Sequence, residues 1–410
     1  MSSALRDSVL TDPLTRKQPW RTLYLLYQVI TTIFLRLPLW VVYYALPSNR
    51  PKSTWTLKRA VMIRAVKLLM HVAYMAAPLG HTPSYLAVED GPDVKAVWIP
   101  PSSRLVVGKI KEWATAAGLE SIKIPGYWIH KAGDDRTPGA PAKRGEKVLL
   151  AFHGGAYVRR SGHPTDTTAN VAKGILEATP SLSRVLSVEY RLTRLLPGPT
   201  PANPFPAALL DAISSFNYLV NELGFEPANV VVDGDSAGAN LALALVRYIV
   251  EHQSFPDVAM PAPPGALVLC SPWADLSVLG HDPGGSIHTN IPTDYVNVTT
   301  PIMEHIIAAF TGPLGPPAAE TNRYISPASV SPMLDKVSYK NFPKTFILNG
   351  GSEVLRDQIR VLYERMAAEM GQDAVYLEMP DAVHDFLVFL WHEPERSEAL
   401  EAIASFLQSE

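Results

Sequence analysis

The later part of the chain repeats one pattern of hydrophobic and polar positions. From about residue 147 onward, short apolar runs alternate with amphipathic stretches of helical period, as in a mostly parallel sheet covered by helices on both faces. The predicted strands are 147–152, 184–190, 229–232, 266–271, 345–349 and 375–379, and the predicted helices are 167–177, 207–223, 237–252, 355–370 and 395–407. This order predicts an α/β fold with a doubly wound, twisted sheet flanked by helices.

Two stretches interrupt the alternation, and we predict that they line a binding site. Residues 197–206 are rich in proline, and residues 281–319 carry many glycines and prolines around one short helix near 302–310. Irregular inserts of this kind often line binding sites. Residues 1–100 are apolar and helix-rich, which favours an N-terminal helical cap over the carboxyl ends of the strands. We therefore expect a cap at 1–100 and a catalytic domain at 101–410, with a cap insert at about 281–320.

The most hydrophobic stretch of the chain runs from Leu23 to Leu46 and is flanked by basic residues. It is long enough to span a bilayer, but it contains Arg36, and a central arginine costs about 2.5–3.5 kcal/mol on the insertion scale. A small-residue cleavage site after a short apolar region is missing, so the segment does not resemble a removable signal peptide. A signal anchor, an interfacial helix and a soluble helix over the active site all stay open. The expected location is accordingly cytoplasmic or membrane-associated.

Composition and charge narrow the choice of partners. With 47% hydrophobic residues, 18% charged residues and a formal charge of −3, the chain is typical of a globular protein and not of one that binds nucleic acid. Its single cysteine, Cys270, ends an apolar run. A buried free thiol is therefore expected there, and an intrachain disulfide is excluded.

The segment Gly234-Asp235-Ser236-Ala237-Gly238 carries the clearest chemical signal. It joins a valine-rich strand to an Ala/Leu-rich helix. A sharp strand-to-helix turn with small residues on both sides lifts a serine hydroxyl to the top of the sheet, at the positive end of a helix dipole. The pattern predicts Ser236 as a nucleophile.

A second glycine-containing segment lies upstream of this turn. The strand 147–152 runs into His153-Gly154-Gly155-Ala156-Tyr157, where paired glycines allow backbone N–H groups to point into a cavity. Acyl transfer builds charge on an oxygen that such donors stabilise. We expect an oxyanion hole from the amides of Gly154, Gly155 and Ala237, with His153 organising the loop.

A serine nucleophile needs a histidine base and a carboxylate that orients the base. The order of serine, acid and histidine along such a fold favours a histidine after the last strand, which is His384. Glu353 directly follows the strand 345–349, whereas Asp357 lies one helical turn later, so we prefer Glu353 as the acid. Asp385 is expected to point elsewhere, and the rival His392 is explained by an exposed surface role.

Taken together, these motifs resemble the hormone-sensitive-lipase-like esterases of the α/β-hydrolase superfamily, over roughly residues 100–410. Besides the two glycine motifs, further landmarks of the family are similar at 190–192, 204–208, 271–276 and 325–327. The N-terminal 100 residues resemble the extended, membrane-proximal versions among fungal members. Two features depart from the family: many members have Asp where this chain has Glu353, and the residues from Thr193 to Asn203 are extra, which predicts a different pocket rim.

The resemblance implies a triad of Ser236, Glu353 and His384, a pocket formed partly by the N-terminal cap, and neither a metal nor another cofactor. The expected function is hydrolysis of a carboxylic ester of a small or medium acyl group, on a substrate that belongs to secondary metabolism. Lactone hydrolysis and acyl transfer use the same triad and remain alternatives. A ligand-binding, receptor-like protein is a further alternative, which the presence of His384 disfavours.

Overall fold

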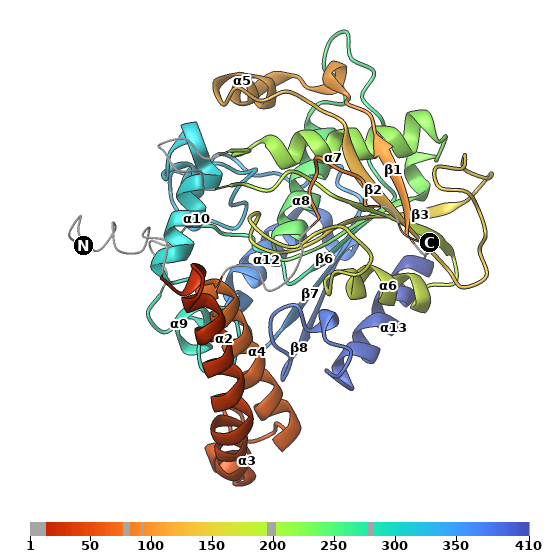
Figure 1. The fold of residues 1–410 in the computed structure, drawn as a ribbon. Helices are drawn as coiled ribbons and strands as arrows, with labels where there is room; N and C mark the ends of the chain where they lie inside the picture. The colour runs from red at the N-terminus through yellow and green to blue at the C-terminus, as the bar shows by residue number, and fades with distance from the viewer. Residues whose placement is uncertain are drawn as a thin grey trace.

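The computed structural model describes residues 14–76, 83–89, 91, 94–194, 202–277 and 282–409. Its centre is an eight-stranded sheet with the order β1-β2-β4-β3-β5-β6-β7-β8 (Figure 1). Strands β3 to β8 pair in parallel, whereas β2 is antiparallel to both β1 and β4. The α/β-hydrolase sheet predicted from the sequence is confirmed. The strands are β1 Lys95–Ile99, β2 Ile124–His130, β3 Lys147–Phe152, β4 Leu182–Val188, β5 Val230–Asp235, β6 Ala266–Cys270, β7 Lys344–Gly350 and β8 Ala374–Met379.

Helices cover both faces of the sheet because the parallel strands are apolar on both sides. One apolar core lies between the sheet and α7, α8 and α12, and a second lies between the sheet and α6 and α13. The helices of the sheet domain are α5 Gly108–Ala116, α6 Ala169–Ala178, α7 Ala207–Asn217, α8 Ala237–Glu251, α12 Arg356–Met370 and α13 Glu395–Gln408. The six strands and five helices predicted after residue 147 are all present, with ends that differ by a few residues.

Strands β1 and β2 are additions to the predicted sheet. Strand β1 lies within residues 1–100, the predicted cap, so the sheet begins earlier in the chain than the boundary at residue 100 implied. In strand β2, Pro125 and Gly126 follow the first residue, and both residue types normally indicate turns. Strand β2 lies between β1 and β4, but its ladder with β4 begins only at Gly126, so Pro125 is paired on one side alone, near the start of the strand, where a proline is tolerated.

The N-terminal part forms a helical hairpin that packs beside the sheet domain. Helix α2 (Trp20–Thr31), a π-helical turn (Thr32–Arg36) and helix α3 (Leu37–Ala45) follow one another directly, and α4 (Leu57–Ala76) returns along them (Figure 1). Tyr44, Trp55 and Ile63 are buried and continue the core below α6 and α13. The hairpin is therefore joined to the catalytic domain through an apolar contact.

The described part of the insert between β6 and β7 contains three α-helices. They are α9 Ser286–Thr289, α10 Pro301–Thr311 and α11 Ala318–Thr321, so the short helix predicted near 302–310 is present. Residue 281, the first of the predicted insert, lies outside the described residues, as do 195–201 in the extra segment from Thr193 to Asn203. The ends of that segment are paired, with the Arg194 N–H donating to the Ala202 carbonyl at 2.8 Å.

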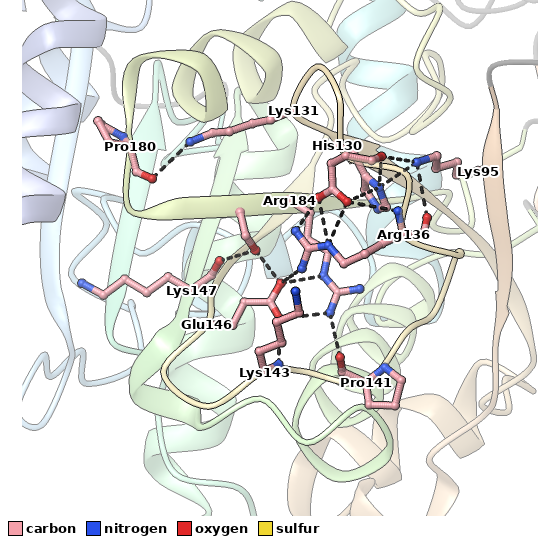
Figure 2. Close-up of polar contacts among 12 residues, drawn as sticks. Lys95, His130, Lys131, Arg136, Pro141, Lys143, Glu146, Lys147, Pro180 and Arg184 are labelled. Atoms are coloured by element: carbon pink, nitrogen blue, oxygen red, sulfur yellow. Dashed lines mark hydrogen bonds and ion pairs between the residues drawn. The ribbon is translucent and has the colours of Figure 1, made fainter.

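A network of charged groups lies near the amino ends of β3 and β4, away from the carboxyl ends that carry the predicted site (Figure 2). Arg184 is fully buried, and its guanidinium lies 3.1 Å from the carboxylate of Glu146. Arg136 joins the same carboxylate and also pairs with Asp134. Because each buried charge has a partner of opposite sign, the network fixes this end of the sheet without an isolated buried ion.

Candidate active site

Ser236 lies in a strained turn between β5 and α8. Its backbone has φ 53° and ψ −115°, a conformation that costs a non-glycine residue about 1–3 kcal/mol and persists only where the surroundings impose it. A Cβ atom on Gly238 would lie 2.0 Å from the Phe152 carbonyl oxygen, and one on Gly234 would lie 2.3 Å from the Gly238 carbonyl oxygen. Both glycines are therefore required by close packing of the backbone around Ser236.

His384 lies beside Ser236, in the turn that follows β8. The distance between Ser236 Oγ and His384 Nε2 is 3.0 Å, which is within hydrogen-bonding range. Both side chains are buried. The structure thus brings together the predicted nucleophile and the predicted base, which are 148 residues apart in the chain.

Glu353 approaches the other ring nitrogen of His384. Its Oε2 atom lies 3.7 Å from Nδ1, close enough for an ion pair but longer than a hydrogen bond. The same oxygen accepts a hydrogen bond of 2.7 Å from the Ser271 hydroxyl and one of 3.3 Å from the Gly350 N–H. These contacts hold the carboxylate at the carboxyl end of β7, on the side of the imidazole opposite Ser236.

Asp385 also contacts the imidazole, so the prediction that its side chain points elsewhere was wrong. Its Oδ2 atom lies 3.1 Å from His384 Nε2. The backbone of Asp385 is left-handed, with φ 46°, and its N–H donates to the Ser271 hydroxyl at 3.1 Å. This turn folds the aspartate back onto the histidine that precedes it. Ser271, which contacts Glu353 as well, was not identified from the sequence.

The electrostatics of the site favour a positive charge on the imidazole. Burial opposes protonation of His384, but the carboxylates of Asp385 and Glu353 outweigh it and raise the pKa of His384 well above its usual value. Burial also raises the pKa of Glu353, and the charge of His384 and the Ser271 hydroxyl offset this only in part. The pKa of Asp235 is raised well above its usual value by burial and by the neighbouring charge of Asp385. Both effects favour the protonated form of this carboxyl group, which lies next to the nucleophile.

The two rivals considered from the sequence lie elsewhere. Asp357 is in the first turn of α12, where it accepts a hydrogen bond from the Ser286 N–H and pairs with Arg356. His392 is fully buried, 3.4 Å from Glu395, so the expected exposed surface role was wrong. It stacks on Trp391 and belongs to the core beneath the turn that carries His384. Cys270 is a buried free thiol, as predicted.

The loop after β3 lies against the nucleophile turn. His153 stacks on Tyr190, whose hydroxyl donates to the His153 carbonyl at 2.6 Å. Burial lowers the pKa of His153 to about 4, so this histidine is neutral at physiological pH and holds the loop in place. Gly154 packs against Asp235, since a Cβ atom there would lie 2.4 Å from Oδ2. Gly155 and Ala156 of this loop line the adjoining pocket, as do Arg159 and Arg160.

A pocket of about 620 Å³ opens above Ser236 and His384. Its walls come from the loop after β3, the insert between β6 and β7, the turn after β8 and helix α4 of the N-terminal hairpin. The side chains contributed by α4, which the sequence did not single out, are Val66, Lys67, Leu69, Met70, His71 and Tyr74. The hairpin therefore forms part of the wall of this pocket.

Comparison with known families agrees with this geometry. A family model described as the alpha/beta hydrolase fold matches residues 149–388, which include Ser236, Glu353 and His384. The chain belongs to the α/β-hydrolase family. The match begins in β3 and ends just after the turn that carries the histidine, so the N-terminal hairpin lies outside it.

Curated relatives and solved structures of this family are esterases by name. An acetyl-hydrolase of Streptomyces hygroscopicus is 29% identical over 66% of this chain and 78% of its own length. Esterase LipU of Mycobacterium tuberculosis is 28% identical over 65% of this chain and 80% of its own. A crystal structure of an esterase from the bacterial hormone-sensitive lipase family has a TM-score of 0.54 and 24% identity, covering 90% of this chain and 96% of the other.

These matches confirm the resemblance to hormone-sensitive-lipase-like esterases. The α/β-hydrolase described here is an ester-cleaving serine hydrolase that acts on carboxylic esters. The fungal-type extension of its N-terminus stays a prediction.

Proposed function

We propose that Ser236, His384 and Glu353 act as a catalytic triad and cleave a carboxylic ester through an acyl-enzyme. The observation that carries the proposal is the 3.0 Å contact between Ser236 Oγ and His384 Nε2, made by a serine in a strained turn at the start of α8. In such an arrangement the imidazole takes the serine proton as the hydroxyl attacks the ester carbonyl, and returns it to the departing alcohol.

Glu353 faces Nδ1 and would stabilise the imidazolium that forms during each proton transfer. Water, activated by His384 in the same way, then attacks the acyl-enzyme and releases the acid. Lactone opening forms the same kind of acyl-enzyme, but the departing alcohol stays attached to the acyl group. In acyl transfer an alcohol, and not water, attacks the acyl-enzyme. A receptor-like function is disfavoured because the base lies within hydrogen-bonding distance of the nucleophile.

The oxyanion hole proposed from the structure differs in one residue from the sequence-based expectation. Among the described residues, no backbone carbonyl accepts a hydrogen bond from the amides of Gly155, Ala156 or Ala237. Gly155 and Ala156 line the pocket, and Ala237 directly follows the nucleophile. Gly154 instead packs against Asp235. We therefore assign the donors to Gly155, Ala156 and Ala237, which would meet the charge that develops on the carbonyl oxygen.

The pocket supports a substrate with a small or medium acyl group, because its 620 Å³ is near the middle of the range for small-molecule sites, about 300–1,000 Å³. The expectation that the substrate is a secondary metabolite rests on the family resemblance alone and stays a prediction.

A panel of p-nitrophenyl esters from acetate to laurate, supplemented with lactones, tests this function. We expect release of p-nitrophenol from the shorter esters, and its loss in Ser236→Ala. Ester hydrolysis that persists in Ser236→Ala would contradict the proposal. Faster turnover of lactones, or product formation only when an acceptor alcohol is added, would replace ester hydrolysis with one of the two alternatives.

A further inference from the structure

Most of the exposed large apolar side chains among the described residues lie on one N-terminal helix. Residues Trp20–Ala45, here called the apolar helix, have a mean hydropathy of 1.7 over their most apolar stretch, which makes them long and apolar enough to cross a membrane. Phe34 is 76% exposed and Val42 is 73% exposed. The other exposed large apolar residues of the helix are Trp20, Leu23, Leu26, Tyr27, Val29, Ile30, Ile33, Leu35, Leu37, Leu39, Val41 and Tyr43.

We propose that this exposed surface inserts into one leaflet of a lipid bilayer, and that the active-site pocket takes its ester from that bilayer. The second part rests on the proposed function. A soluble monomer rarely exposes an apolar patch this large, and such patches normally mark protein or membrane contacts.

The distribution of the exposed residues favours lipid over a protein partner. Successive residues of an α-helix are about 100° apart, so a helix that docks in a protein groove buries one stripe, at intervals of three and four residues. In the apolar helix, the run Ile33-Phe34-Leu35 is exposed at three consecutive positions, and so is Val41-Val42-Tyr43. The apolar surface is therefore wider than one stripe, as expected for a helix surrounded by acyl chains.

One of the two charged residues within the apolar helix, Arg36, pairs with a polar partner on the helix itself. The Arg36 guanidinium donates to the side-chain oxygen of Gln28, which is buried, and lies 5.8 Å from the centre of the Tyr27 ring. Pairing with a polar partner reduces the cost of placing a cation near hydrocarbon. The arginine that argued against membrane contact in the sequence is thus compatible with it in the structure.

Both ends of the apolar helix are tied to the rest of the hairpin, which favours an orientation along the membrane surface. Before the helix, the Thr15 hydroxyl donates to the Met75 carbonyl at 2.6 Å and Arg16 donates to the Tyr74 carbonyl at 2.8 Å. After it, Arg50 donates to the carbonyls of Tyr44 and Trp55 at 2.9 and 2.7 Å.

Helix α4 is in turn fixed to the catalytic domain. The Arg59 guanidinium pairs with the Glu395 carboxylate through two hydrogen bonds, the longer of them 2.7 Å. The Trp55 indole N–H donates to the Asp381 carbonyl at 3.0 Å, and Lys67 donates to the Ile291 carbonyl at 2.5 Å. A helix that crossed the bilayer would have to break the contacts at its ends, whereas a helix lying in one leaflet keeps all of them.

The pocket has an apolar rim next to this surface. Leu69 of α4 and Leu390 of the turn after β8 line the pocket and are nevertheless 55% and 62% exposed. Tyr74 also lines the pocket, and its ring lies 5.5 Å from the guanidinium of Arg16, just before the apolar helix. Insertion of the helix therefore brings the rim close to the lipid, and the substrate class that fits is an apolar ester dissolved in the bilayer.

The test uses the full chain with phosphatidylcholine vesicles. Flotation measures binding, and hydrolysis is followed with p-nitrophenyl acetate in water and with a long-chain ester dissolved in the vesicles. The variant Phe34→Asp/Val42→Asp is compared with Val330→Asp/Met333→Asp, which charges two apolar residues of the sheet domain that are 56% and 73% exposed.

We expect wild type and the Val330/Met333 variant to float with the vesicles. The Phe34/Val42 variant should bind at least tenfold less, hydrolyse the vesicle ester at least tenfold more slowly, and hydrolyse p-nitrophenyl acetate at the wild-type rate. Equal flotation of the three proteins, or a wild type that stays with the aqueous fraction, would overturn the proposal. The orientation is tested with an N-terminal tag and a protease added on the side of the membrane that carries the catalytic domain. Cleavage of the tag supports the in-plane orientation, and protection of the tag contradicts it. If the wild type does not hydrolyse p-nitrophenyl acetate, the proposed function is refuted. Flotation would still measure whether the apolar helix binds the vesicles.

Discussion

Replacement of Asp385 by asparagine should shift the pH dependence of hydrolysis toward acid. Its carboxylate lies 3.1 Å from His384 Nε2, the atom that exchanges a proton with Ser236. His384 acts as a base only when it is neutral, so activity is lost as the pH falls through the raised pKa of His384. Asp385→Asn removes a negative charge that stabilises the imidazolium, and the pKa of His384 falls.

The size of this shift follows from the distance. Opposite unit charges 3.1 Å apart interact by about 5 kcal/mol at an effective dielectric constant of about 20, and one pKa unit corresponds to about 1.4 kcal/mol. About four units is therefore an upper value. Glu353 still faces the ring in the variant, and the asparagine amide forms new hydrogen bonds, so we expect a shift of about one to two units, within the range of about 1–3 units for a neighbouring opposite charge.

The measurement is kcat/KM for a soluble ester as a function of pH, because its acidic limb reports the pKa of the base in the free enzyme. Asp357→Asn, which changes a carboxylate remote from His384, is the matched control and should leave the limb in place. An acidic limb in Asp385→Asn that coincides with that of wild type, or lies at higher pH, would refute the role assigned to Asp385.

Two further predictions concern the acid and the nucleophile turn. Glu353→Gln should lower kcat about 100-fold or more, because the imidazolium loses the carboxylate on its Nδ1 side. The kcat of Asp357→Asn should stay within about threefold of the wild-type value. Steady-state kinetics of both variants measure this, and a larger loss in Asp357→Asn than in Glu353→Gln would show that the acid was chosen wrongly. Gly238→Ala should lower the free energy of unfolding by more than about 3 kcal/mol, since its Cβ would lie 2.0 Å from the Phe152 carbonyl oxygen. At Gly224 a Cβ would meet nothing within 4 Å, so Gly224→Ala should lower the free energy of unfolding by only about 1–2 kcal/mol, because of its positive φ. Urea denaturation measures both losses of stability, and equal losses would contradict the packing account.

Much of the fold was predictable because strands and helices after residue 147 differ clearly in apolar period. Strand β2 was missed because Pro125 and Gly126 normally mark turns, and its antiparallel pairing with β1 and β4 explains why this segment is extended. The three residues of the proposed triad were predicted from motif and chain order. By contrast, the orientation of Asp385 depends on a left-handed backbone and on Ser271, which directly follows β6. Neither local propensity nor spacing reports such contacts. His392 was misjudged for a similar reason, since acidic neighbours suggested a surface that the turn after β8 in fact buries.

The claim that Ser236 is the acylated nucleophile is tested most directly by labelling with a fluorophosphonate. The intact protein should gain one phosphonyl group, peptide mass analysis should locate it on Ser236, and Ser236→Ala should not be labelled. A label on another residue, or labelling that persists in Ser236→Ala, would contradict the account.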